Sequence, residues 1–415
     1  MIQEPLGVAI DIGTTTIALH LINMNTKARL ATISGANAQI PYGADVTSRI
    51  RYCAQNGNET LMHVIREQIA TMIKEACDQT GMESKNIEYL TIAANTVMQH
   101  LIAGYSPVSM GVAPFDTVSL FGTELPVWDD LPVAGHAQIY YTPAISAYVG
   151  GDITAGLLAA DFENISDPAI FLDIGTNGEI VLKHKGTYYC CATAAGPAFE
   201  GAEIEMGMAA ENGAVDHVWL DHGDISSHPV LRFSTIGDEK PRGLCGSGLL
   251  DTLAVLLETE AVDETGRLDR DKYWLTPDAP ESKNEHNNQA SGGVFITAGD
   301  IRKLQLAKAA IAAGIQVLLH FARISESDVK LLALAGGFGS YMDLQSAARI
   351  GLFPKNLLPA AKTLGNTAGE GAAIALTSKE ARSRLMDIKA SCEYVELSSI
   401  AFFNDRFVDQ MTFEQ

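Results

Sequence analysis

The 415-residue chain has little of what nucleic-acid binding or membrane insertion would require. Basic residues number 29 against 50 acidic ones, a formal net charge of −21, whereas nucleic-acid binding needs concentrated Lys and Arg. No run of about 18 or more apolar residues is present, so we expect no membrane span. The start, Met-Ile-Gln-Glu-Pro, lacks the basic and apolar segments of a signal peptide.

Cysteine is also scarce and scattered along the chain. The six residues are Cys53, Cys77, Cys190, Cys191, Cys245 and Cys392. None of them forms a Cys-x-x-Cys pair or an iron–sulfur ligand series, so we expect no iron–sulfur ligands in this chain. Reduced thiols in a cytoplasmic protein are the simplest interpretation.

The most informative stretch that is present runs from Gly7 to Leu21. An apolar run ends in Asp11-Ile-Gly-Thr-Thr-Thr16 and a second apolar run follows, a pattern that predicts two buried strands joined by a glycine-bearing turn. Asp11, at the strand end, is placed to hold a hydrated divalent cation. Glycine lets a ligand approach the main chain, so the turn's amides and hydroxyls would face an anion. The candidate phosphate ligands are Gly13, Thr14, Thr15 and Thr16.

A second copy of this pattern occurs between Phe171 and Leu182. It again has an apolar run, Asp-Ile-Gly-Thr and a second apolar run, beginning its turn at Asp173. Two matching hairpins predict two similar subdomains that face one polyphosphate, since a chain of this length is too long for one compact core. The second set of candidate ligands is Gly175, Thr176, Asn177 and Gly178, with Asp173 as the second metal-side carboxylate.

Other glycine-bearing segments complete the candidate site. Asp152 follows two glycines and opens an Ala- and Leu-rich helix, so it either caps that helix or directs its carboxylate at the metal or the attacking water. A helix of small residues from Gly365 to Ala375 suits close helix–helix packing. Loops that approach the nucleotide are expected at Gly196, at Gly246 and Ser247, and at Gly336, Gly337, Phe338 and Gly339, where the backbone would lie flat against adenosine.

The order of these motifs resembles the actin, hexokinase and heat-shock-chaperone superfamily of ATP-binding proteins, over residues 7 to 378. This resemblance implies an α/β, two-lobed actin-like ATPase fold with ribonuclease-H-like duplicated subdomains and a nucleotide cleft between the lobes. It divides the chain into a first lobe over 1–148, a second lobe over 149–378, and a carboxy-terminal strand and helix over 379–415. The resemblance implies that the chain binds ATP and Mg²⁺. It also implies that Asp11 and Asp173 hold metal-bound water and that Asp152 orients the attacking water.

Five segments resemble more specifically the reductive activators of corrinoid-dependent methyltransferases: 194–202, 243–251, 300–310, 334–341 and 393–413. In that family ATP binding and hydrolysis accompany the reduction of an inactivated cob(II)alamin protein to cob(I)alamin. The resemblance implies a corrinoid protein as partner and an external, ferredoxin-like electron donor. Family members usually carry an amino-terminal ferredoxin-like domain with an iron–sulfur cluster, and we expect this chain to lack that domain.

Three other functions share part of this pattern. A small-molecule kinase of the same superfamily would usually carry a sugar-binding signature, and we find none. A filament or scaffold protein would pellet in an ATP-dependent manner. An iron–sulfur activator of acyl-CoA dehydratases would require cluster cysteines at a dimer interface. The sequence has no direct sign of oligomeric state, so it leaves open whether the protein forms a homodimer.

Overall fold

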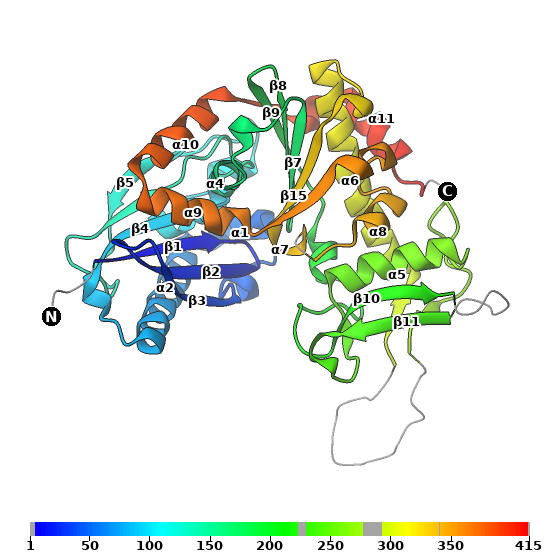
Figure 1. The fold of residues 1–415 in the computed structure, drawn as a ribbon, viewed down its shortest axis with the longest axis horizontal. Coiled ribbons are helices and arrows are strands. Elements are labelled where there is room, and N and C mark those ends of the chain that lie inside the picture. The colour runs from blue at the N-terminus through cyan, green and yellow to red at the C-terminus, as the bar shows by residue number, and fades with distance from the viewer. Residues whose placement is uncertain (1–4, 223–229, 277–292, 340, 414–415) are drawn as a thin grey trace, which may run out of the picture. The chain divides into compact units, whose positions relative to one another are not determined.

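The computed structural model describes residues 5–222, 230–276, 293–339 and 341–413, coloured along the chain in Figure 1. The chain forms two compact units. Unit 1 comprises Met1–Asp167, Val181–Cys191 and Leu364–Val395, and unit 2 comprises Pro168–Ile180, Ala192–Thr363 and Glu396–Gln415. The expected lobes over 1–148 and 149–378, with a tail over 379–415, divide the chain at other positions and stay a prediction.

A six-stranded sheet of order β3-β2-β1-β4-β6-β5 forms the centre of unit 1. Antiparallel pairing of β1 and β2 sets Ile12 opposite Ile17, so the predicted turn lies between them. β4 pairs with β1 in parallel, which brings the carboxyl ends of both strands to one edge. The strands are β1 (Leu6–Ile12), β2 (Thr16–Asn23), β3 (Arg29–Ala36), β4 (Ile87–Ala94), β5 (Thr123–Pro126) and β6 (Gln138–Tyr141).

Helices cover both faces of this sheet (Figure 1). Because strand side chains alternate, Val8 and Ile10 of β1 pack in the large core with α2 (Glu59–Thr80), whereas Ala9 packs in a smaller cluster with α4 (Gly151–Ala159) and α9 (Thr367–Thr377). A Cβ added to Gly371 of α9 would lie 2.0 Å from the Ala155 carbonyl oxygen of α4. The close packing expected of the small-residue helix is therefore confirmed.

The predicted elements of unit 1 agree well with the structure. The amphipathic pattern of residues 59–80 predicts a helix, which is α2. The sequence also predicts Asn95 as a helix cap, and Asn95 caps α3 (Thr96–Ala103) by accepting a hydrogen bond from the Met98 amide at 3.0 Å. The other helices of this unit are α1 (Val46–Asn56) and α10 (Lys379–Ser391).

A second six-stranded sheet has the order β16-β15-β7-β8-β9-β17. Its strands are β7 (Ala169–Ile174), β8 (Gly178–His184), β9 (Thr187–Thr193), β15 (Leu331–Ala335), β16 (Ala361–Gly365) and β17 (Cys392–Tyr394). The run β9-β8-β7-β15-β16 repeats the run β3-β2-β1-β4-β6, and β15 pairs with β7 in parallel as β4 pairs with β1. The expected duplication of subdomains is visible in this strand order.

Unit 2 also contains smaller sheets and several helices. The strands are β10 (Ala214–Asp221), β11 (Val230–Thr235), β12 (Gly243–Leu244), β13 (Lys272–Trp274) and β14 (Phe295–Thr297). The helices are α5 (Gly246–Glu258), α6 (Ala298–Ala322), α7 (Gly336–Gly339), α8 (Leu344–Arg349) and α11 (Ala401–Asp409). Among the described residues, α6 is the one helix long and apolar enough to cross a membrane, and 78% of its most apolar window is buried, as is typical of a core helix.

Two local expectations need correction. The stretch from Gly336, expected as a flat loop, forms a short helical turn, α7, in which Gly336 has a φ of 90° and lets the chain change direction directly after β15. The tail strand, expected around residues 394–397, is β17 and ends at Tyr394. The sequence is polar over residues 277–293, which predicts a surface excursion, and this stretch lies outside the described residues except at its last position.

Candidate functional site

The first hairpin closes with a tight backbone turn. The Gly13 amide donates to the Thr16 carbonyl at 2.9 Å, and a Cβ on Gly13 would lie 2.8 Å from that oxygen, so the turn admits only glycine there. Asn37 donates to the Gly13 carbonyl at 2.9 Å, and the buried Arg49 donates to the Thr14 carbonyl at 2.6 Å. These donors hold the turn's carbonyls in fixed directions.

The Thr14 hydroxyl is held by the cap residue of α3. The Asn95 carboxamide oxygen accepts from the Met98 amide, so its nitrogen faces Thr14 and donates to Thr14 Oγ1 at 3.1 Å. Sequence reading identified Asn95 as a cap but not as a partner of the hairpin. The start of α4 packs here too, because a Cβ on Gly150 would lie 2.5 Å from the Asn95 Cα.

Asp11 stands at the end of β1, half-buried, beside the start of α9. Asn366, the cap residue of α9, donates to Asp11 Oδ2 at 2.9 Å, while its own oxygen accepts from the Gly369 amide at 3.0 Å. Burial raises the pKa of Asp11 to about 6, and the hydrogen bond from Asn366 opposes part of that rise. Asn366 was missed from sequence, although an Asn directly before a small-residue helix is a cap signal.

Asp152 lies within the first turn of α4, whose cap residue is Gly150, so the interpretation of Asp152 as the cap is wrong in position. Its Oδ1 accepts from the Ile153 amide at 2.8 Å. Burial raises the pKa of Asp152 to about 7, and the negative charge of Asp11 adds to the rise. Unit 1 thus brings together two carboxylates whose proton affinities reach the neutral range, a pattern typical of acid–base sites.

The second hairpin closes with a turn one residue shorter and has different neighbours. The Gly175 amide donates to the Asn177 carbonyl at 2.9 Å, and the buried Thr176 donates through Oγ1 to Glu200 Oε2 at 2.9 Å. Gly178 begins β8, and a Cβ there would lie 2.7 Å from Thr193 Oγ1. The sequence predicted that the loop at Gly196 approaches the nucleotide but did not single out Glu200, because no local pattern shows which side chain of the loop reaches the hairpin.

Asp173 and the predicted adenosine loop are neighbours in unit 2. A Cβ on Gly336 would lie 2.6 Å from both Asp173 Oδ1 and the Ile174 carbonyl oxygen, so glycine is required at this positive φ. Phe338 of the loop stacks on Phe199, with ring centroids 5.3 Å apart and planes inclined by 15°. A Cβ on Gly246 would lie 1.9 Å from the Phe199 carbonyl oxygen, so packing explains this glycine.

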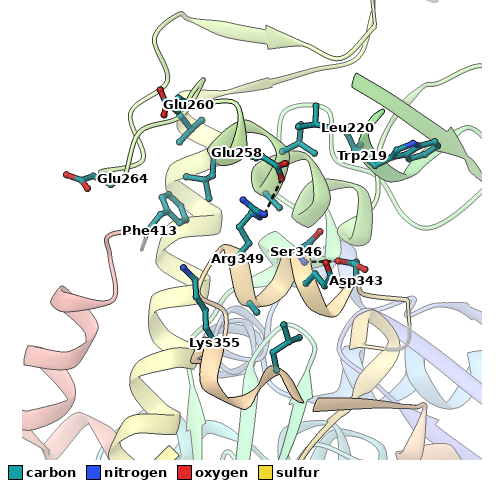
Figure 2. Close-up of a pocket in the computed structure, with 18 of the residues that line it drawn as sticks. Trp219, Leu220, Glu258, Glu260, Glu264, Asp343, Ser346, Arg349, Lys355 and Phe413 are labelled. Atoms are coloured by element: carbon teal, nitrogen blue, oxygen red, sulfur yellow. Dashed lines mark hydrogen bonds and ion pairs between the residues drawn. The ribbon is translucent and has the colours of Figure 1, made fainter. Parts of the chain in front are cut away.

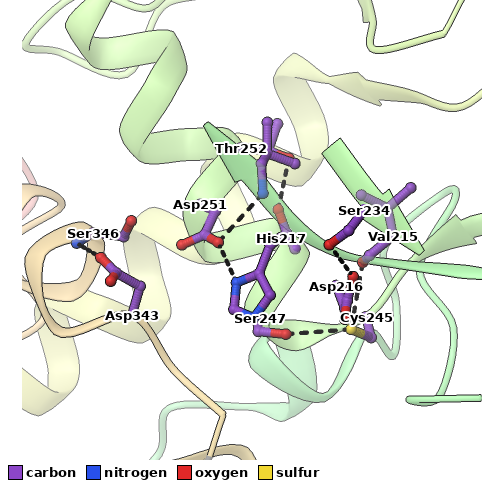
Figure 3. Close-up of polar contacts among 12 residues, drawn as sticks. Val215, Asp216, His217, Ser234, Cys245, Ser247, Asp251, Thr252, Asp343 and Ser346 are labelled. Carbon is purple, nitrogen blue, oxygen red and sulfur yellow. Dashed lines mark hydrogen bonds and ion pairs between the residues drawn. The ribbon is translucent and has the colours of Figure 1, made fainter. Parts of the chain in front are cut away.

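Ser247 belongs to a buried network at the start of α5 (Figure 3). Its Oγ lies 3.4 Å from Cys245 Sγ, and one turn further along α5 Asp251 Oδ2 lies 3.0 Å from His217 Nδ1. Burial raises the pKa of Asp251, and hydrogen bonds from Ser346, His217 and the Val218 amide oppose part of that rise. The geometry gives Ser247 a structural partner, and its contact with a nucleotide stays a prediction.

A cavity of about 1060 Å³ lies along α5 and α8 in unit 2 (Figure 2). Both acidic and basic side chains line it, and an ion pair joins Arg349 to Glu258 at 3.3 Å. Trp219 and Phe413 line opposite ends in this view. None of the residues predicted for the nucleotide lines this cavity.

The oxygen-rich side chains suit a hard divalent cation. Carboxylates and hydroxyls are the ligands Mg²⁺ prefers, usually one or two of them with water and phosphate oxygens completing the shell. Within the described residues no three His, Cys, Asp or Glu side chains form a ready-made metal cage. Asp11 with Asp152 in unit 1, and Asp173 in unit 2, would suit a cation held largely through water.

Comparison with known proteins agrees with this geometry. A family model described as the C-terminal domain of RACo, the ASKHA domain, matches residues 167–415, and one described as the RACo middle region matches residues 6–165. The chain belongs to the RACo family. The predicted actin-like ATPase fold is therefore confirmed, and an ATPase-type domain of this family implies nucleotide binding.

Individual RACo-like proteins cover nearly the whole chain. The corrinoid activation enzyme RamQ of Eubacterium limosum is 33% identical over 98% of this chain and 70% of its own length. A [Co(II) methylated amine-specific corrinoid protein] reductase of Methanosarcina barkeri is 24% identical over 98% of this chain and 77% of its own. The solved structure of a reductive activator for corrinoid, iron–sulfur protein matches with a TM-score of 0.88 and 34% identity, covering 100% of this chain and 67% of that one.

Proposed function

We propose that this chain binds and hydrolyses ATP and couples it to the reductive reactivation of a cob(II)alamin protein in a corrinoid methyltransferase system. The observation that carries the proposal is the 33% identity, over 98% of the chain, to a corrinoid activation enzyme. The two Asp-Ile-Gly-Thr hairpins support the ATP part, since both stand at strand ends with buried, oriented threonines.

In this proposal one Mg·ATP engages both hairpins. Backbone amides and the Thr14 hydroxyl donate to phosphate oxygens. Such pre-oriented donors stabilise the charge that develops on the phosphate, which is the main catalytic contribution in phosphoryl transfer. Asp152, whose pKa lies near 7, orients the attacking water and takes up its proton. Mg²⁺ supplies neutralisation of phosphate charge when it is bound, and Asp11 and Asp173 hold its water ligands. Residues Gly336 to Gly339 frame the adenosine.

The partners follow from the relatives. The corrinoid protein is the proposed target, because two relatives are described as acting in corrinoid activation or reduction. The reduction of cob(II)alamin to cob(I)alamin consumes one electron per cobalt, and the proposed source is an external, ferredoxin-like donor. A cytoplasmic location and a homodimer belong to the same proposal, and six free thiols, five of them buried, suit a reducing compartment.

The test is ATP turnover with and without a purified methylated-amine-specific corrinoid protein in its cob(II)alamin state. Titanium(III) citrate serves as the one-electron donor, and the loss of the cob(II)alamin electron paramagnetic resonance signal reports the reduction. We expect the corrinoid protein to stimulate turnover and ATP to be required for reduction. Stimulation by a sugar or small acid instead would favour a kinase, and ATP-dependent pelleting alone would favour a filament protein.

A matched variant separates ATP-driven from direct chemical reduction. Asp173→Asn should retain the fold and lose the ATP-dependent decrease of the cob(II)alamin signal, whereas any background decrease with titanium(III) in the absence of ATP should be the same for the variant and the wild type. Equal reduction by the variant and the wild type would contradict the coupling of ATP to this chain.

A further inference from the structure

The equivalent threonines of the two hairpins make hydrogen bonds of opposite direction. We propose that Glu200 is a positioning residue that sets the Thr176 hydroxyl to accept from its ligand, whereas Thr14 is set to donate. Thr176 would then serve the cation and its water, and Thr14 the phosphate. This inference rests on the proposed nucleotide site and assigns a different ligand to each hairpin.

The direction at Thr176 follows from the chemistry of its partner. A carboxylate carries lone pairs and no proton, so in the 2.9 Å contact between Thr176 Oγ1 and Glu200 Oε2 the hydroxyl donates. A threonine hydroxyl has one proton. With that proton directed at Glu200, the oxygen serves any ligand only as an acceptor, as the hydroxyl of a phosphate-loop threonine serves Mg²⁺.

The direction at Thr14 is the reverse. The Asn95 oxygen is committed to the Met98 amide, so the contact of 3.1 Å to Thr14 Oγ1 comes from the Asn95 NH₂ group. Thr14 therefore accepts from Asn95, and its own proton points to another acceptor. A phosphate oxygen is such an acceptor, and it lacks a proton of its own at neutral pH.

The backbone around Glu200 fixes its position. Glu200 ends a short 3₁₀ turn, Pro197–Glu200, that lies between Gly196 at φ 76° and Gly201 at φ 79°. A Cβ on Gly201 would lie 2.7 Å from the Met208 carbonyl oxygen. The preceding residue, Phe199, is buried and stacks on Phe338. A carboxylate on so constrained a turn can hold a hydroxyl in one orientation, which a mobile side chain could not.

Glu200→Gln is the informative variant, because the amide has nearly the same shape but can donate to Thr176 as well as accept. Affinity for a non-hydrolysed ATP analogue is measured by calorimetry twice, with excess Mg²⁺ and with EDTA. For Glu200→Gln we expect the Mg²⁺-dependent gain in affinity to fall by about 10-fold, with affinity in EDTA unchanged within about 2-fold. Thr176→Val should behave alike, and Thr176→Ser should keep the gain.

Thr14→Val is the matched control in the other hairpin. It should weaken binding equally with Mg²⁺ and with EDTA, because it removes a donor to phosphate. Mn²⁺ binding in the presence of the analogue, followed by paramagnetic resonance, gives a second readout that is independent of turnover. Glu200→Gln should weaken Mn²⁺ binding and Thr14→Val should not.

The failures are distinguishable. If wild type binds the analogue with a Mg²⁺-dependent gain and Glu200→Gln keeps that gain, the inference is wrong and the proposed function stands. An equal loss in Mg²⁺ and in EDTA would also overturn it, since Glu200 would then be structural. No heat with wild type would remove the proposed function and the inference together.

Discussion

The two hairpins share the residues Asp-Ile-Gly-Thr but differ in everything that surrounds them. The first is held by donors: Asn37 and Arg49 on its carbonyls and Asn95 on Thr14. The second is held by an acceptor, Glu200, and packs its aspartate against a helical glycine turn. The repeated motif places a glycine-bearing turn at each strand end, whereas the neighbours decide whether that turn suits an anion or a cation.

The largest effect is expected from the two aspartates themselves. Asp11→Asn and Asp173→Asn should each lower ATP turnover by roughly 10²–10³-fold, the scale found when a pre-oriented electrostatic group is removed. Steady-state phosphate release measures this, and circular dichroism checks the fold. Wild-type turnover in either variant would break the view that both hairpins serve one reaction.

Substitution of the equivalent glycines should change the free energy of unfolding to different extents in the two hairpins. Gly13→Ala should destabilise the protein by about 1–3 kcal/mol, because its Cβ would meet the Thr16 carbonyl at 2.8 Å. At the equivalent Gly175 the nearest atom is Glu200 Oε1 at 3.8 Å, an ordinary contact, so Gly175→Ala should change stability by about 0.5 kcal/mol or less. Urea unfolding measures both. Equal losses would mean that the two turns are built alike.

Asp152→Asn tests the charge beside the first hairpin. The folded-state pKa of Asp152 is raised from 3.8 to about 7, so its stabilising contribution is present below pH 3.8 and is lost as pH rises to about 7. The free energy of unfolding of the variant should therefore exceed that of the wild type by about 1–2 kcal/mol at pH 8. This difference should shrink as the pH falls toward 4. Thermal unfolding from pH 4 to 8 measures it, with the exposed Asp387→Asn as control. A gain that does not vary with pH would contradict the raised pKa.

A modest effect is expected at Asn366. Asn366→Ala removes the cap of α9 and the hydrogen bond to Asp11, at a cost of about 1 kcal/mol. Since that bond favours the charged carboxylate, the pKa of Asp11 should rise above about 6, and the acidic limb of the pH–rate profile should move to higher pH. Asn366→Asp keeps a cap oxygen and serves as the comparison. An unmoved acidic limb would mean that Asn366 acts only as a cap.

Local sequence patterns predicted most of the fold and, of the candidate site, the hairpins but not the side chains that hold them. The helix over residues 59–80, the hairpin at Asp11 and the cap at Asn95 follow from periodicity, glycine and side-chain capping, which act over a few residues. The bond between Asn366 and Asp11 joins positions 355 apart, and Glu200 reaches Thr176 across 24 residues. Such contacts depend on how the sheet and its helices are stacked, and no local pattern encodes them. Arg49 was detectable in principle, as a charged residue on the apolar face of Val46, Ile50 and Cys53.

Calorimetric titration with a non-hydrolysed ATP analogue and Mg²⁺ tests the central claim, that two differently built hairpins serve one nucleotide. We predict one bound analogue per chain for wild type, and the loss of that single event in Asp11→Ala and equally in Asp173→Ala. Two bound analogues per chain, or binding that survives the loss of either aspartate undiminished, would contradict it.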